Sequence, residues 1–222
     1  MGGPGGDDDL PEALPRVALM LALRKRGLRE PAVMRAFEQV PRDRFVEPES
    51  RPLAWADQAL PISCGQTISQ PSVIAWSTEA LDLGPTHKVL EVGTGSGYHA
   101  ALLGRIARAV VTLERFRTLA ASAAERLRDL DIRNVEVVVA DGALGWPAGA
   151  PYDRIVVNAA VERVPPALFE QLAENGVLVA PVGPPEAAQM LTRFARTRSG
   201  LVVRELVRVR FVPLLPGVAS RL

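Results

Sequence analysis

The stretch LEVGTGSGYHAALLGRIA, residues 90–107, joins an apolar run to a helical pattern through a cluster of glycines. Residues 87–93 are typical of a buried strand, and residues 96–109 are typical of a helix. A short apolar strand, a glycine-rich turn and a helix in this order predict one unit of an open parallel sheet. The turn between them is where such sheets usually bind a ligand.

The same alternation continues along the chain. It predicts strands at residues 110–114, 135–141, 152–160 and 176–183, and helices at residues 115–130 and 165–174. After residue 185 the alternation stops, and two strand-like runs on either side of Ser199 and Gly200 predict an antiparallel hairpin. We therefore expect an α/β fold: a doubly wound, mostly parallel, Rossmann-like sheet with an antiparallel C-terminal hairpin and N-terminal helices.

The N-terminal part has a different pattern. An amphipathic helix is predicted from Arg16 to about Gly27, a second helix at 31–40, and a third at 71–83. Residues 41–71 are rich in proline and lack periodicity, which is typical of a functional cover. We expect residues 1–15 to be a disordered tail and 16–222 to be one domain. Its parts are the N-terminal helices and lid (16–71), the cofactor-binding core (72–185), and the hairpin and tail (186–222).

Composition excludes several classes of function. The 222 residues carry a net charge of only +1, which gives no reason to expect a nucleic-acid partner. Cys64 is the single cysteine, so an intramolecular disulfide is excluded, and we expect no metal site. Because the sequence contains no apolar run long enough to span a bilayer and no secretory leader pattern, we expect a cytoplasmic protein without a membrane partner.

The glycines of the loop are spaced G-x-G-x-G, at positions 93, 95 and 97. A dinucleotide fingerprint would have its third glycine where this chain has Tyr98, and no Gly-Lys-Ser/Thr triplet follows to make a P-loop. Small residues still let the backbone approach a ligand closely. The loop therefore predicts a nucleoside ligand without specifically indicating a pyrophosphate.

Three acidic residues stand at the ends of successive strands. We expect Glu91 to face the loop and attract an ammonium or sulfonium group, Glu114 to accept hydrogen bonds from ribose hydroxyls, and Asp141 to reach an adenine amino group. Such acids favour S-adenosylmethionine, whose sulfonium and amino groups are cationic. The predicted cofactor site comprises Glu91, Gly93, Thr94, Gly95, Ser96, Gly97, Glu114, Asp141 and Gly142.

From about Leu21 to Leu214 the chain resembles the protein-L-isoaspartate O-methyltransferase family. The resemblance rests on the blocks VPRDRFV (40–46), GQTISQP (65–71), LEVGTGSGY (90–98), APYDRIVV (150–157), PPALFEQL (165–172), PVGP (181–184) and RFVPL (210–214). It implies methyl transfer from S-adenosylmethionine to the free α-carboxylate of an L-isoaspartyl residue in a protein or peptide, leaving S-adenosylhomocysteine. The ester then closes to a succinimide, which reopens partly to normal aspartate.

The resemblance also implies roles for individual residues. Ser69 would lie beside the substrate carboxylate as the catalytic residue, and Thr67 and Ile68 would shape the pocket. The peptide channel would be lined by Val212, Pro213 and Leu214. From the residues alone, Ser69 could instead be the N-cap of the helix that follows it, a role compatible with touching the substrate. The expected partners are isoaspartyl proteins and peptides, and we expect a monomer.

Among the positions that depart from the family pattern, two matter for the substrate, and alternatives stay open. Asn158 and Glu162 replace the usual residue types near the substrate mouth, and a carboxylate at Glu162 would disfavour acidic peptides if it faced the channel. One alternative is a methyltransferase dedicated to an aspartyl side chain of a single peptide. The other is a non-catalytic protein that binds S-adenosylmethionine.

Overall fold

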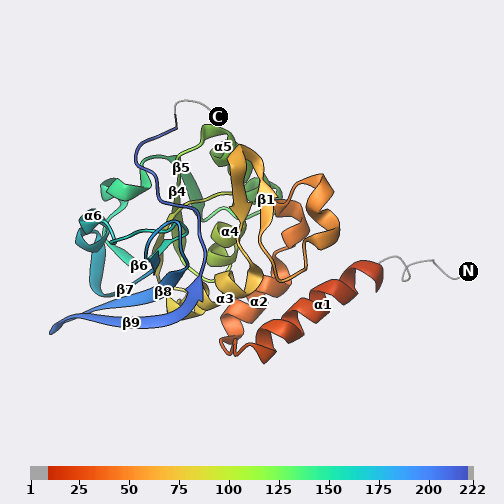
Figure 1. Cartoon of the computed structure of the whole chain (residues 1–222), viewed down its shortest axis with the longest axis horizontal. Coiled ribbons are helices and arrows are strands. Elements are labelled where there is room, and N and C mark those ends of the chain that lie inside the picture. The colour runs from red at the N-terminus through yellow and green to blue at the C-terminus, as the bar shows by residue number, and fades with distance from the viewer. Residues whose placement is uncertain (1–9, 220–222) are drawn as a thin grey trace, which may run out of the picture.

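The fold is a seven-stranded sheet in the order β5-β4-β3-β6-β7-β8-β9, seen in a computed structural model that describes residues 10–219 (Figure 1). The strands are β3 (Lys88–Val92), β4 (Ala109–Glu114), β5 (Val135–Val139), β6 (Tyr152–Val157), β7 (Leu172–Val182), β8 (Gln189–Thr197) and β9 (Gly200–Val209). The first five in this order pair in parallel, and β8 and β9 pair antiparallel. The predicted fold class is confirmed.

The centre of the sheet is β3, which pairs with β4 on one side and β6 on the other. The chain runs outward from β3 to β5 and then returns to start β6 beside β3, so the direction of strand addition reverses there. In open α/β sheets ligands bind beyond the carboxyl ends of the strands at such a reversal. The glycine loop, which follows β3, lies at this point.

Helices cover both faces of the sheet, and strand alternation decides which side chain meets which helix. The helices α3 (Pro71–Ala80), α4 (Tyr98–Gly104) and α5 (Arg117–Asp129) lie on one face, and α6 (Pro166–Glu170) lies on the other. In β3, Val89 packs with Leu103 of α4, whereas Leu90 packs with Leu168 of α6. Because side chains alternate along a strand, Glu91 shares the α4 face with Val89.

The N-terminal helices α1 (Leu10–Lys25) and α2 (Pro31–Gln39) pack on the outside of α3 and α4. They form one core with α4, in which the ring of Phe37 meets the ring of Tyr98 edge-on at 6.1 Å. Helix α1 begins six residues earlier than the expected Arg16, and residues 1–9 of the expected tail lie outside the described residues. In Figure 1, α1 extends from one side of the molecule and the β8–β9 hairpin from the other.

The proline-rich segment before α3 has more structure than its sequence suggested. Two 3-10 turns, Arg42–Phe45 and Pro48–Leu53, precede an antiparallel hairpin of β1 (Leu60–Ile62) and β2 (Gln66–Ile68). Strands of three residues are too short to leave a periodic signal in the sequence.

The second difference lies after α6, where β7 begins four residues earlier than expected. The helix ends at Glu170, and Leu172 already pairs with Tyr152 of β6. A register irregularity after Tyr152 interrupts the β6–β7 pairing before the regular ladder resumes at Arg154 and Val177.

Candidate active site

The glycine loop after β3 has a backbone that few other residues can adopt. Gly93 has a φ of 95° and Gly97 a φ of 90°, both in the left-handed region where side chains with a Cβ are strained. A Cβ on Gly97 would also lie 3.0 Å from the Cβ of Ala123 in α5. The loop therefore turns tightly into α4. The missing side chain of Gly97 lets the start of α4 pack closely against α5.

A cavity lies where this loop meets the β1–β2 hairpin and the segment after β9. Twelve of the fifteen predicted site residues line it: Thr67, Ile68, Ser69, Gly93, Thr94, Gly95, Ser96, Glu114, Gly142, Val212, Pro213 and Leu214. Residues that the sequence did not single out for the site also line it, among them Tyr98, His99, Arg115 and Phe116, and so does Asn158, which was expected near the substrate mouth. The cavity thus brings together the β1–β2 hairpin, the ends of β3, β4 and β6, Gly142 and the segment after β9, which are far apart in sequence.

The carboxylate of Glu114, at the end of β4, lines the cavity and holds the loop. Its Oε2 accepts a hydrogen bond from the backbone N–H of Gly95 at 2.8 Å, and its Oε1 accepts one from the N–H of Phe116 at 3.0 Å. The side chain is almost fully buried. Glu114 therefore fixes the position of the loop as well as presenting a carboxylate to a ligand.

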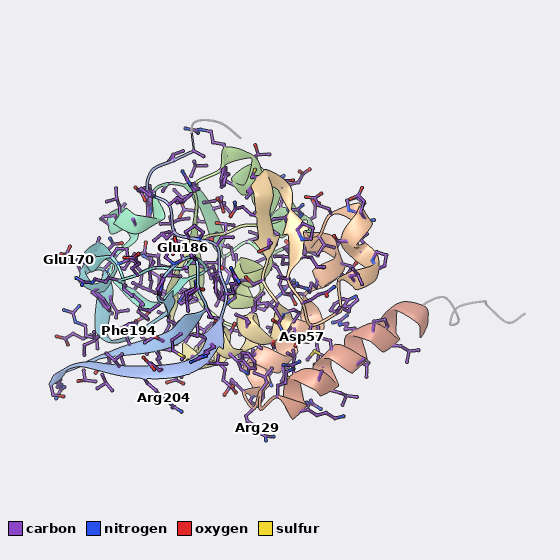
Figure 2. All side chains as sticks on the ribbon, viewed as in Figure 1. Arg29, Asp57, Glu170, Glu186, Phe194 and Arg204 are labelled. Carbon is purple, nitrogen blue, oxygen red and sulfur yellow. The ribbon has the colours of Figure 1, made fainter. Side chains whose placement is uncertain are left out.

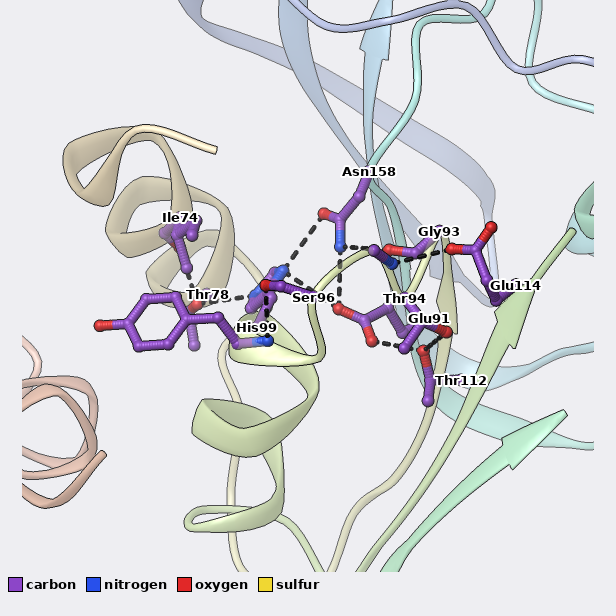
Figure 3. Close-up of polar contacts among 12 residues, drawn as sticks. Ile74, Thr78, Glu91, Gly93, Thr94, Ser96, His99, Thr112, Glu114 and Asn158 are labelled. Carbon is purple, nitrogen blue, oxygen red and sulfur yellow. Dashed lines mark hydrogen bonds and ion pairs between the residues drawn. The ribbon is translucent and has the colours of Figure 1, made fainter. Parts of the chain in front are cut away.

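Glu91 does not face the cavity, which corrects the expectation from the sequence. Its side chain is completely buried on the α4 face of β3. Its Oε1 accepts a hydrogen bond from Nδ2 of Asn158 at 2.8 Å, and its Oε2 accepts one from Oγ1 of Thr112 at 2.5 Å (Figure 3). The reason is the strand pleat, which directs this position under the loop and not toward the ligand.

The imidazole of His99, in the first turn of α4, completes this buried cluster. Its Nδ1 lies 3.2 Å from Oδ1 of Asn158 and 3.5 Å from Oε1 of Glu91, and its Nε2 lies 3.0 Å from Oγ1 of Thr78 (Figure 3). Burial raises the pKa of Glu91 to about 8 and lowers the pKa of His99 to about 4. At pH 7 the pair is therefore mostly uncharged.

Asp141 and Gly97 also lie outside the cavity lining, which again differs from the expectation. Oδ1 of Asp141 caps the following turn through the N–H of Ala143 at 2.9 Å, and its Oδ2 accepts a bond from the N–H of Gly217 at 2.7 Å. Its neighbour Gly142 lines the cavity instead, where a Cβ would lie 2.4 Å from Cγ1 of Val92. Asp141 thus ties the C-terminal segment to the end of β5.

Ser69 stands just before α3, but it does not cap that helix. The N-cap residue is Gln70, whose side chain makes no cap hydrogen bond, and the N–H of Ser72 in the first turn donates instead to Oδ1 of Asp57 at 2.8 Å. The backbone oxygen of Ser69 accepts a hydrogen bond from Nη2 of Arg42 at 2.9 Å, and Nε of Arg42 donates to the oxygen of Ala54 at 2.9 Å. A buried guanidinium therefore holds the Ser69 segment, and the capping alternative is wrong.

Arg42 was missed as a site-forming residue because its role depends on contacts across the lid. Burial lowers its pKa to about 10, so the guanidinium stays charged at pH 7. Its Cζ lies 5.0 Å from the centre of the Tyr98 ring, in cation–π geometry. The only sequence signal was its place in the block VPRDRFV.

The C-terminal segment closes one wall of the cavity by pairing with the chain after β6. The N–H of Ala160 donates to the oxygen of Val212 at 2.7 Å, and the N–H of Leu214 donates to the oxygen of Ala160 at 2.8 Å. Glu162, two residues on, is exposed and does not line this cavity. The expectation that Glu162 disfavours acidic peptides depended on its facing the peptide channel. The structure does not place it there.

The lining offers hydrogen-bonding groups of the kind expected at a nucleoside site. The backbone of the glycine loop and the Glu114 carboxylate together present hydrogen-bonding groups for a nucleoside.

Within residues 10–219 no group of three or more His, Cys, Asp or Glu side chains is arranged to hold a metal ion. No helix of this part of the chain is long and apolar enough to cross a membrane.

Comparison with known proteins gives a consistent result. Residues 15–219 match the family model described as protein-L-isoaspartate(D-aspartate) O-methyltransferase. A protein-L-isoaspartate O-methyltransferase of Rhodopseudomonas palustris is 55% identical over 93% of this chain and 96% of its own length. One of Xanthobacter autotrophicus is 54% identical over 95% of this chain and 96% of its own length.

Solved structures agree with this result. A protein-L-isoaspartate O-methyltransferase superimposes with a TM-score of 0.81 at 30% identity, covering 92% of this chain and 67% of that one. A putative one from Plasmodium falciparum, in complex with S-adenosyl-L-homocysteine, superimposes with a TM-score of 0.78 at 26% identity, covering 89% of this chain and 97% of that one.

Proposed function

Because the chain belongs to the protein-L-isoaspartate(D-aspartate) O-methyltransferase family, we propose that the cavity between the glycine loop, the β1–β2 hairpin and residues 212–214 is its active site. Membership confirms the predicted activity: the enzyme uses S-adenosylmethionine to methylate L-isoaspartyl residues in protein repair. The observation that carries the proposed location is the convergence of Ser69, Glu114 and Val212 on one cavity.

The reaction needs no general base from the protein. The acceptor is a carboxylate, which is already a nucleophile at pH 7, and S-adenosylmethionine supplies the methyl group when bound. The protein must therefore orient the acceptor and exclude water. In our proposal the Ser69 hydroxyl orients the substrate carboxylate, and the backbone carbonyl of Ser69 is held in place by Arg42.

Cofactor binding is assigned to the opposite wall of the cavity. We propose that Glu114 accepts hydrogen bonds from the ribose hydroxyls, since it ends β4 next to the loop, and that residues 93–96 and Gly142 pack against the nucleoside. Glu91 and Asp141 act indirectly. Glu91 supports the loop through its hydrogen bond with Asn158, and Asp141 holds the C-terminal segment through the N–H of Gly217.

The lid and the C-terminal segment are assigned to the peptide substrate. Thr67 and Ile68 come from β2, and Val212, Pro213 and Leu214 come from the other side of the cavity. Closing an apolar cover over the reacting atoms strengthens the electrostatic interactions beneath it and keeps water from competing with the acceptor. This accounts for the long proline-rich segment before α3.

We further propose that the enzyme works as a monomer in the cytoplasm, without nucleic-acid or membrane partners. All the residues that we assign to cofactor and substrate line one cavity of a single chain, apart from Glu91 and Asp141, which act indirectly, and a net charge of +1 offers little attraction for a polyanion. Light scattering on the eluting protein with and without an isoaspartyl peptide tests the monomer; a mass of two chains would contradict it.

The decisive experiment is a peptide panel. Unrelated sequences are synthesised in matched L-isoaspartyl and L-aspartyl forms, and base-labile methyl esters are counted after incubation with labelled S-adenosylmethionine. We expect turnover on the isoaspartyl forms alone. Turnover confined to one aspartyl peptide would indicate a dedicated methyltransferase, and cofactor binding without any ester would indicate a non-catalytic protein.

A further inference from the structure

A second groove opens on the far side of Ser69 from the glycine loop. It shares Thr67, Ser69, Asn158 and Val212 with the active-site cavity, so the two adjoin. Its other walls come from α3 and from the end of β9 with the residues that follow. A polypeptide whose isoaspartyl residue is at Ser69 therefore has to place its neighbouring residues near this groove.

The groove is basic. Three arginines line it, Arg26, Arg208 and Arg210, and none of its lining residues is acidic. Only Arg26 is neutralised, because its Nε lies 3.2 Å from Oδ2 of Asp57. Within residues 10–219, Arg208 and Arg210 form no ion pair, and Arg210 contacts only the backbone oxygen of Glu186, at 3.4 Å. Two positive charges are left without partners.

Acidic side chains near the groove do not cancel this charge. Glu79, on α3, has its Oε1 occupied by the backbone N–H groups of Arg29 and Glu30, at 2.8 and 2.9 Å. Glu162 is exposed and lies outside the groove lining. The carboxylate of Glu186, labelled in Figure 2, forms no ion pair with Arg210 within the described residues, although the Arg210 guanidinium contacts the backbone oxygen of Glu186. The uncompensated charge of the groove thus comes from the end of β9 and the residue after it.

We propose that this groove selects isoaspartyl substrates with acidic side chains next to the isoaspartyl residue, through Arg208 and Arg210. The proposal rests on the function given above. An acidic peptide is favoured because the groove continues the reaction site and also offers apolar surface, from Trp76 and Phe211, for the aliphatic parts of the peptide. Arginine is suited to this role because its fork binds a carboxylate through two parallel hydrogen bonds.

The first test uses the unmodified enzyme and three isoaspartyl peptides of equal length. One carries Glu at the two positions before the isoaspartyl residue, one carries Glu at the two positions after it, and the third has Gln at all four. At low salt we expect the better Glu peptide to have a KM about three- to tenfold below that of the Gln peptide. The advantage should shrink at 0.5 M NaCl, because salt screens exposed charges.

The second test removes the charges. In Arg208→Gln/Arg210→Gln the ratio of kcat/KM between the Glu and Gln peptides should fall to near one, and Arg208→Lys/Arg210→Lys should keep most of it. The control is Arg198→Gln, which removes one positive charge, against two in the double variant, from the exposed turn between β8 and β9. This turn lies about 30 Å along β9 from Arg208. The control should keep the full ratio.

The outcomes distinguish a failure of the proposed acidic selection from a failure of the proposed methyltransferase function. Equal KM values for all three peptides in the unmodified enzyme, or a preference that survives in Arg208→Gln/Arg210→Gln, would overturn the acidic selection and leave the methyltransferase intact. Absence of ester on every isoaspartyl peptide would instead overturn the proposed function. Cofactor affinity, measured by calorimetry for each variant, shows that a lost preference does not come from a misfolded protein.

Discussion

The side-chain nitrogen of Asn158 donates a hydrogen bond of 2.8 Å to Oε1 of Glu91, under the glycine loop. The same nitrogen lies 3.3 Å from the backbone oxygen of Gly93, so one amide contacts both the buried acid and the loop above it. The first residue after β6 is thereby connected to the end of β3. The position of the loop depends on this cluster, which leads to the first prediction.

Glu91→Gln should change how stability depends on pH. The pKa of Glu91 is raised to about 8 in the folded protein by burial, with a contribution from Glu114, so folding keeps a proton that the unfolded chain releases above about pH 4.5. The stability that Glu91 contributes is therefore complete below that pH and is lost as the pH rises toward 8. His99, with its pKa lowered to about 4, acts in the opposite sense below its unfolded value of 6.5.

The two effects offset each other below pH 6.5, so the interval from pH 6.5 to 8 isolates Glu91. There the free energy of unfolding should fall by up to about 1.4 kcal/mol per pH unit in the unmodified enzyme. In Glu91→Gln, which keeps an acceptor for Asn158, this fall should be absent. Urea unfolding at half-unit pH steps measures the difference, and parallel curves for both proteins would contradict the assignment.

Glu114→Ala should weaken cofactor binding. The variant loses a charged acceptor that also holds the N–H of Gly95, so we expect a loss of about 1.5–3 kcal/mol in the free energy of S-adenosylmethionine binding. Calorimetric titration measures it, and Glu125→Ala on the exposed side of α5 is the control. An unchanged Kd in Glu114→Ala would remove Glu114 from the cofactor site.

Ser69→Ala should lower kcat while leaving cofactor affinity nearly intact, because the hydroxyl is assigned to the substrate carboxylate. Initial rates on an isoaspartyl peptide, together with calorimetry of S-adenosylmethionine, separate the two effects. The control is Ser63→Ala in the same lid, where the exposed hydroxyl donates to Glu47 at 2.9 Å. Equal losses of rate and affinity in Ser69→Ala would mean that the residue serves structure.

Arg42→Lys should loosen the lid. Lysine cannot reproduce the fork that donates to the carbonyls of Ala54 and Ser69, so we expect about 1.5–3 kcal/mol less stability and a lower kcat. Thermal unfolding and peptide turnover measure the two effects. Arg44→Lys, at an exposed position of the same 3-10 turn, should change neither. A fully active and stable Arg42→Lys would show that the guanidinium does not anchor Ser69.

Local sequence determined the fold class and the place of the cofactor loop. Buried strand segments such as residues 177–182 are apolar because both faces of a parallel sheet are covered. The helices between the strands leave a 3.6-residue pattern that can be recognised without knowing any contact. Gly93 and Gly97 could be recognised as turn residues because they stand between a strand pattern and a helix pattern. The resemblance of short blocks to a known family then supplied the reaction.

Only the tertiary structure decided which way the acids point and what surrounds them. Strand alternation states that Glu91 and Val89 share a face, but not which face α4 covers, so the direction of the carboxylate depended on helix packing. The grip of Arg42 on Ser69 and the basic groove at Arg208 join residues far apart in the chain. Such contacts form when the chain folds back on itself, and they leave no periodic pattern in the sequence.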